Sequence, residues 1–128
     1  MRPDLYLQFK ENVLVTDLQM LRPDMLIVLS YLSWWCFKHN LPCRVTSIMD
    51  HVETRISRTH EAGRAVDIST RGFGPRDIDR LITYLNERVG ILGAYSKSDG
   101  VQRVAIYHDA GLGKHIHIQV SKNMNEEF

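Results

Sequence analysis

Two short segments of the chain, residues 65–69 and 115–120, alternate apolar residues with polar ones and are predicted to be β-strands. Because side chains alternate between the two faces of a strand, Asp67 lies on the polar face of the first segment. His115, His117 and Gln119 share the polar face of the second segment. If the two strands are neighbours, Asp67 and His117 converge. Imidazole and carboxylate groups are good ligands for zinc.

A third candidate ligand, His60, precedes Asp67 by seven residues. Gly63 lies between them and permits a tight return of the chain, which would bring His60 to the same point in space. Three protein ligands leave a fourth zinc position for water, which is the arrangement of catalytic rather than structural zinc. Zinc would lower the pKa of this water and polarise a bound carbonyl. The spacing alone leaves open that these side chains form an ordinary solvated strand face.

The elements around these segments predict an α+β domain. Helical spacing of apolar residues predicts helices over residues 23–40 and 75–90, and two further strands are predicted over residues 44–49 and 101–107. Loops or turns are expected at residues 50–63, 72–75, 96–100 and 109–113. This order of elements predicts a mainly antiparallel sheet with helices packed on one face and a zinc cleft on the other.

The composition is that of one ordinary domain over residues 1–128, with its core at about residues 22–122. Hydrophobic residues make up 44% of the chain, which is enough for a core that needs no metal to fold. A functional metal is therefore favoured over a structural one. With 16 basic and 15 acidic residues the net charge is +1, so no nucleic-acid partner is indicated.

The sequence carries no sign of a membrane segment. The longest apolar stretch, residues 25–37, is too short to span a bilayer, and the first ten residues lack a signal pattern. We expect a soluble protein made in the cytoplasm without membrane insertion. Cys36 and Cys43 are expected to be buried free thiols, and Trp34 and Trp35 are expected to belong to the core.

Residues 60–68, His-Glu-Ala-Gly-Arg-Ala-Val-Asp-Ile, resemble the His-x-x-Gly-x-Ala-x-Asp motif of the D-Ala-D-Ala metallopeptidase superfamily. That superfamily includes peptidase family M15, the lysostaphin-type enzymes and the hedgehog signalling domain. Residues 114–120 are similar to its His-x-His strand. The local sequence of both segments is closest to that of hedgehog. The motifs cover about a tenth of the chain, and the order of predicted elements extends the match to residues 23–122.

The resemblance implies a hedgehog-like or DD-peptidase-like fold with zinc bound by His60, Asp67 and His117. It also implies hydrolysis of amide bonds in peptidoglycan stem peptides. Compact domains of this kind resemble phage or prophage cell-wall endopeptidases of the endolysin type. The implied partners are a peptidoglycan peptide and, in a phage, virion or lysis proteins. The protein would then act on the cell wall after release or as a virion component.

Three positions depart from the superfamily pattern. The catalytic glutamate expected near the last zinc histidine is missing, because the corresponding positions are Lys114 and Gly111. Arg58 stands where a serine is usual. His115 is the first candidate for the general base, since it shares a strand face with His117 and lysostaphin-type enzymes look similar at that position. His108 and Asp109 are second candidates, with a solvated turn as the alternative.

Arg58 and Arg55 are candidate substrate-binding residues, because a guanidinium group binds the carboxylate ends of wall peptides well. Two other functions remain open. The missing glutamate fits a zinc-binding, catalytically inactive hedgehog-like binding domain. The same fold also fits a structural phage protein.

Overall fold

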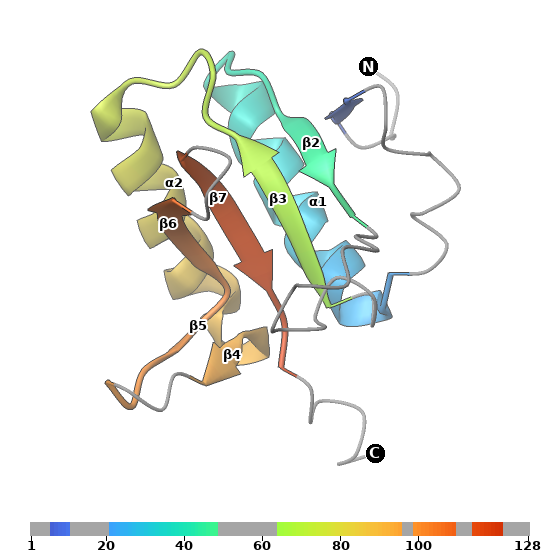
Figure 1. Ribbon diagram of the computed structural model, residues 1–128, viewed down its shortest axis with the longest axis vertical. Coiled ribbons are helices and arrows are strands. Elements are labelled where there is room, and N and C mark those ends of the chain that lie inside the picture. The colour runs from blue at the N-terminus through green and yellow to red at the C-terminus, as the bar shows by residue number, and fades with distance from the viewer. Residues whose placement is uncertain (1–5, 11–20, 49–63, 96–98, 110–113, 122–128) are drawn as a thin grey trace.

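The structure is a computed structural model that describes residues 6–10, 21–48, 64–95, 99–109 and 114–121 (Figure 1). Its helices are α1 (Pro23–Lys38), α2 (Pro75–Val89) and the short 3₁₀ helix η2 (Gly90–Leu92). Its strands are β1 (Gln8–Phe9), β2 (Arg44–Ser47), β3 (Ala65–Ser69), β4 (Ala94–Tyr95), β5 (Gln102–Arg103), β6 (Ala105–Asp109) and β7 (Lys114–Gln119).

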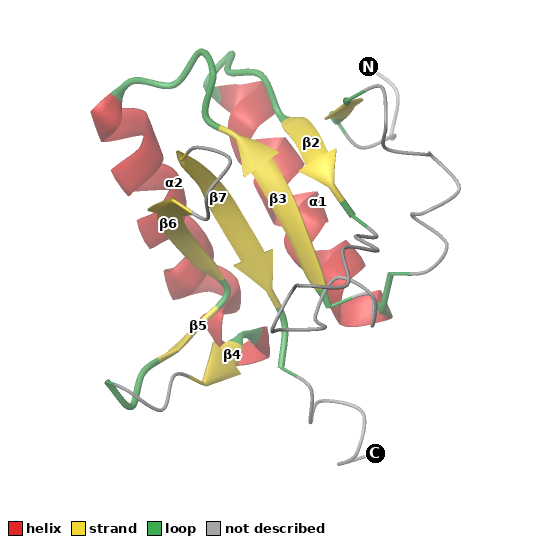
Figure 2. Ribbon diagram, in the orientation of Figure 1, coloured by secondary structure: helices red, strands yellow, loops and turns green. Residues whose placement is uncertain are grey.

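Five of the strands form one sheet in the order β1-β2-β3-β7-β6. Only β1 and β2 are parallel, and the other neighbours are antiparallel. β4 and β5 form a separate two-stranded sheet. Figure 2 shows α1 and α2 side by side on one face of the large sheet. The predicted class, α+β with a mainly antiparallel sheet and helices on one face, is therefore confirmed.

Both helices lie where the apolar spacing predicts them. Each begins with proline, whose fixed φ angle suits a first helical turn. In α2, the Asp77 carboxylate accepts a hydrogen bond from the Gly74 amide at 2.9 Å and so closes the helix start. The turn predicted before α2 is also present, with Gly72 at a φ of 91° that favours glycine.

The strand prediction for residues 65–69 is confirmed residue for residue, but the one for residues 101–107 needs correction. That segment is two strands, β5 and β6, separated at Val104. The side chain of Asn86 on α2 causes the break. Its Oδ1 accepts hydrogen bonds from the amides of Val104 and Ala105 at 2.8 and 3.0 Å. β6 then continues to Asp109, which belongs to a strand and not to the predicted loop.

The core lies between the helices and the sheet. It takes side chains from one face of the central strands, including Val66, Ile68, Ile116 and Ile118, all fully buried. Predicted loop residues 50–63 and 110–113 lie outside the described residues, as do residues 96–98 of the predicted turn. Among the described residues, neither α-helix has the length and apolar content that a membrane span requires.

Cys36 and Cys43 are buried in this core as free thiols, as predicted. The tryptophan prediction is half wrong. Trp35 is buried, whereas 55% of Trp34 is exposed. Adjacent helical residues point about 100° apart, so only one of the two indoles faces the sheet.

Candidate metal centre

β3 and β7 lie side by side at the middle of the sheet and bring the candidate ligands together. Asp67 pairs directly with His117 across the two strands, and Ser69 pairs with His115. Residues directly opposite each other in an antiparallel pair point to the same face. The side chains of Asp67, His115 and His117 therefore share the face turned away from α1 and α2. We call this face the outer face.

The three side chains are close enough to hold one ion. His117 Nδ1 lies 2.9 Å from Asp67 Oδ1, and His115 Nε2 lies 3.4 Å from the same oxygen. One potential ligand atom from each residue falls within 4.8 Å of the other two. Two imidazole nitrogens and a carboxylate oxygen are a donor set that zinc accepts.

The centre is largely shielded from solvent. The side chain of Asp67 is only 9% exposed, and those of His117 and His115 are 12% and 16% exposed. An ionised carboxylate is costly to bury unless it is paired with positive charge or with a metal. The burial of Asp67 therefore distinguishes this carboxylate from one on an ordinary solvated strand face.

Each ring nitrogen of His117 faces an oxygen atom. Nδ1 contacts Asp67 Oδ1, and Nε2 lies 2.9 Å from Gln119 Oε1. Carboxylate and amide oxygens accept hydrogen bonds, whereas a neutral imidazole carries a single N–H. This arrangement would be satisfied if Nε2–H donated to Gln119 and if Nδ1 and the Asp67 carboxylate together held a metal ion.

A reversed Gln119 amide gives a metal-free alternative. Its NH₂ group would donate to His117 Nε2, and Nδ1–H would donate to Asp67.

The predicted strand pattern placed Gln119 on the polar face but assigned it no role. The signal was available in the sequence, because residues two apart on a strand share a face.

The neighbouring strand β2 supports Asp67 through an irregular register. Val45 pairs with Ile68 and Ser47 pairs with Asp67, so β2 has one extra residue at this point. The hydroxyl of Thr46 donates to the carbonyl oxygen of Asp67 at 3.3 Å. Bulges of this kind re-aim side chains and are common beside functional sites.

The structure brings together two predicted ligands, Asp67 and His117, with the predicted base, His115. The third predicted ligand, His60, lies outside the described residues, as do Arg55, Arg58 and Gly111.

Two other predicted site residues, His108 and Asp109, belong to β6, the strand next to β7. In β6 the backbone of His108 pairs with His115, and that of Asp109 pairs with Lys114, an exposed residue. Arg64 precedes β3, and its Nη1 lies 3.4 Å from the carbonyl oxygen of Val120. Burial lowers the pKa of Arg64, and the nearby positive charge of Arg22 lowers it further.

Comparisons with protein-family models, curated proteins and solved structures give no match to this chain. The class that the fold and the site define is thus an α+β domain with a candidate metal-binding group of Asp67, His115 and His117 on its central strands.

Proposed function

We propose that the protein is a zinc metallopeptidase that hydrolyses amide bonds in peptidoglycan stem peptides, as an endopeptidase or a D,D- or L,D-carboxypeptidase. The observation that carries the proposal is the direct pairing of Asp67 with His117 at 2.9 Å in the shielded centre of the sheet. The resemblance of residues 60–68 and 114–120 to the D-Ala-D-Ala metallopeptidase motifs supplies the reaction class. Such a substrate places the action at the cell wall, after release or as part of a virion.

In this proposal Asp67 Oδ1 and His117 Nδ1 are two of the zinc ligands, and His60 is the third. Zinc so bound would polarise the scissile carbonyl and acidify the attacking water. Gln119 accepts the Nε2–H of His117 and so presents Nδ1 to the metal. In this shielded site, the negative charge of the Asp67 carboxylate would offset part of the positive charge of the cation.

His115 is the proposed general base. It lies on the same strand face as His117, and its Nε2 is 3.4 Å from Asp67 Oδ1. It would therefore be near a water bound to a metal that Asp67 and His117 held. This role answers the absence of glutamate at positions 111 and 114. The geometry also allows His115 to be a ligand in place of His60, and the two roles have different consequences. Loss of a base leaves zinc bound, whereas loss of a ligand releases it.

The test combines metal analysis with cleavage of purified muropeptides. We expect one zinc per chain and chelator-sensitive release of fragments, detected by mass spectrometry. Asp67→Asn should abolish both zinc binding and cleavage, because an amide is a weak zinc ligand. Asp79→Asn, an exposed position on α2, is the matched control and should change neither. His115→Ala should retain zinc and lose cleavage.

Each failure has a separate meaning. If Asp67→Asn still binds zinc fully, the metal site is wrong. If the wild type binds zinc through Asp67 but cuts no stem peptide, the peptidase is wrong and the non-catalytic zinc-binding domain replaces it. If His115→Ala loses zinc and His60→Ala keeps it, His115 is the third ligand.

A further inference from the structure

The outward side of α1 carries an unusual concentration of large apolar side chains. Trp34 is 55% exposed and Ile27 is 49% exposed. Three further residues on this helix are each more than a third exposed: Leu26, Tyr31 and Phe37. At 100° per residue, all five lie within a sector of about 140°, opposite the buried side of the helix. We call these five residues the α1 outer surface.

A helix on the surface of a globular protein normally turns charged and polar residues outward. α2 follows that rule, because its exposed positions include Arg76, Asp79, Arg80 and Glu87. On the outward sector of α1, the polar residues are Ser30 and, at the helix end, Lys38. The sequence of α1 is therefore that of a helix covered on both sides, although the described chain covers only one.

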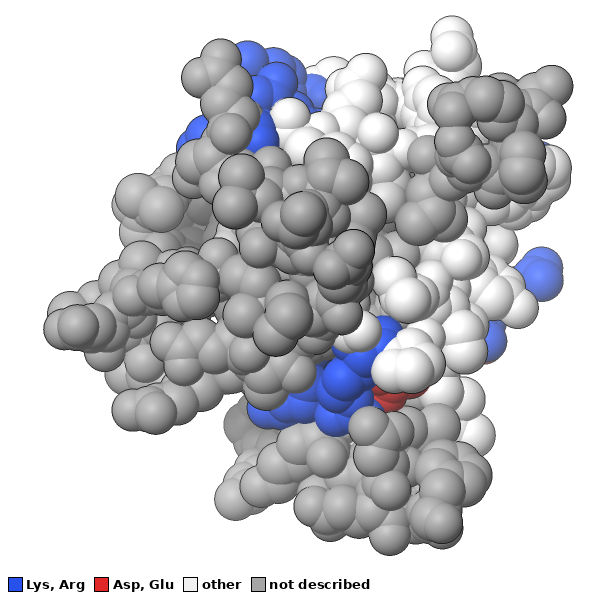
Figure 3. Space-filling view, turned by 90° about the vertical axis from the view of Figure 1, so that its right-hand side faces the viewer, with Lys and Arg blue, Asp and Glu red and all other residues white. Residues whose placement is uncertain are grey.

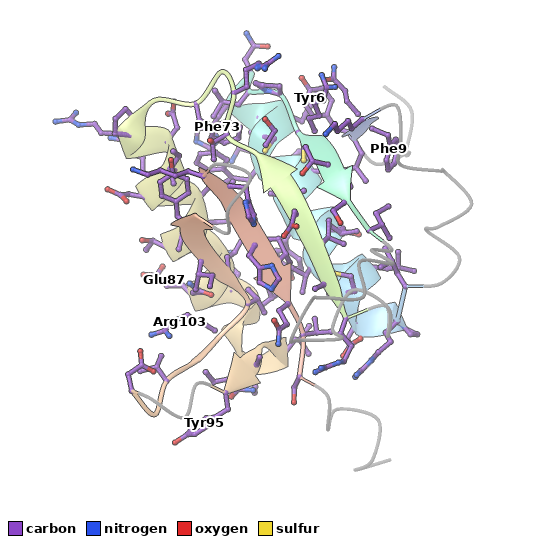
Figure 4. The ribbon with its side chains drawn as sticks, in the orientation of Figure 1. Tyr6, Phe9, Phe73, Glu87, Tyr95 and Arg103 are labelled. Carbon is purple, nitrogen blue, oxygen red and sulfur yellow. The ribbon has the colours of Figure 1, made fainter. Side chains whose placement is uncertain are left out.

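Aromatic contacts make this surface continuous. The rings of Trp34 and Phe37 stack with centroids 6.0 Å apart, and Tyr6 meets Phe37 edge-on at 5.6 Å. Figure 4 shows Tyr6 beside one end of α1. The Lys38 ammonium lies 6.0 Å from the Trp34 ring centroid, so the one charge on the sector packs against the aromatic group.

We propose that the α1 outer surface pairs with the same surface of a second copy, forming a two-fold symmetric dimer. The size fits this occupant. From their exposed fractions, the five residues and Tyr6 expose on the order of 500 Å², the upper range for the largest apolar patch on a monomer. A standard interface buries about 800 Å² per partner, so these residues would form its apolar centre and the neighbouring polar residues its rim.

The charge pattern also favours a second copy. The outward sector of α1 carries no carboxylate and only the amine of Lys38, so a charged partner gains little from it. Its complement is another uncharged, aromatic surface, and a two-fold axis supplies that complement from the protein itself. An axis near the middle of the surface would place Trp34 against its counterpart. Tyrosine and tryptophan are the residues that most often dominate interface energetics.

A partner bound to the α1 outer surface would not cover the candidate metal centre. α1 packs on one face of the sheet, and Asp67 and His117 lie on the other (Figure 1). In the view from the β1 side, most of the described surface is neither basic nor acidic, and the charged side chains gather in separate groups (Figure 3). Because the α1 outer surface and the metal centre are on opposite sides of the sheet, the proposed dimer does not depend on the proposed peptidase activity.

The test is sedimentation velocity and light scattering of the purified full chain across a range of concentrations. We expect a wild-type dimer. Trp34→Glu should raise its dissociation constant at least about tenfold, because it buries a charge at the centre of the interface. Arg80→Glu, an exposed change on α2, is the control and should leave the dimer intact. Circular dichroism checks that each variant is folded, and Ile27→Gln replaces Trp34→Glu if the latter is not.

A wild type that stays monomeric at all concentrations would overturn the proposal. So would a folded Trp34→Glu or Ile27→Gln variant that dimerises as well as the wild type. A dimer that Arg80→Glu disrupts and the α1 variants do not would move the interface to α2 and overturn it equally.

Discussion

The two faces of the sheet carry opposite kinds of side chain, although the same strands build both. On the helix side, Val66, Ile68, Ile116 and Ile118 are fully buried in the core. On the outer face, the residues between them are Asp67 and His117, which contact each other. Period-two alternation thus lets β3 and β7 fix the fold with one set of residues and hold a chemical site with the next.

The difference means that stability and chemistry can be changed separately. Adjacent positions along β3 or β7 alternate between the core and the outer face that carries the site. The strands are positioned by packing that does not involve the histidines. The core therefore acts as a rigid support for the site, and loss of a site residue should leave the fold in place.

The largest expected effect compares the same substitution on the two faces. Ile118→Ala on the helix side should lower the free energy of unfolding by about 2–5 kcal/mol, because it removes buried methyl groups and leaves a cavity. Ile106→Ala is the outer-face control. Ile106 pairs with His117 and is 37% exposed, so its replacement should cost no more than about 1 kcal/mol.

Urea unfolding followed by circular dichroism measures both values. Equal losses for Ile118→Ala and Ile106→Ala would contradict the comparison, since the outer face would then contribute as much to stability as the core.

A smaller effect is expected at Gln119, which tests what orients the site. Its Oε1 lies 2.9 Å from His117 Nε2. Gln119→Leu should weaken zinc binding by about 10–100-fold, which is typical when a partner of a ligating histidine is removed. Gln119→Glu keeps an acceptor at this point and should restore most of the affinity. Competition with a chromophoric chelator measures the zinc affinity of each variant.

Unchanged affinity in Gln119→Leu would show that His117 is oriented without Gln119.

The sequence predicts much of this comparison because both strands have strict alternation. Val66 and Ile68 on either side of Asp67 leave only one face for the carboxylate, and the pattern around His117 does the same. The neighbour relation of the two strands followed from the resemblance and not from the alternation. Their exact pairing is a tertiary result that the structure supplies.

Two features could not be predicted from local pattern. The break at Val104 depends on the side chain of Asn86, which is 18 residues away in the chain. The exposure of Trp34 was missed because α1 is apolar on all sides, so its spacing does not show which indole faces the sheet. The role of His60 stays a prediction.

The smallest expected effect concerns the two thiols on the helix side, which are reactive groups placed in the core. A hydrogen bond to Cys36 and burial both raise the pKa of the Cys43 thiol, because both favour its protonated form. The thiolate is the reactive form of Cys43, and both side chains are fully buried. Neither cysteine should therefore react with a thiol reagent in the folded protein. On the helix side, burial lowers the reactivity of the thiols. On the outer face, the shielded Asp67 carboxylate instead lies in contact with His117.

The same raised pKa predicts a modest pH dependence of stability. The folded protein keeps the Cys43 proton, while an unfolded thiol loses it above about pH 8.5. The contribution to stability is therefore complete below that pH and is lost progressively as the pH rises above it. Chemical unfolding at a series of alkaline pH values measures this decline, and Cys43→Ala should flatten it. Rapid labelling of the native protein at neutral pH would contradict the burial of both thiols and with it the helix-side half of the comparison.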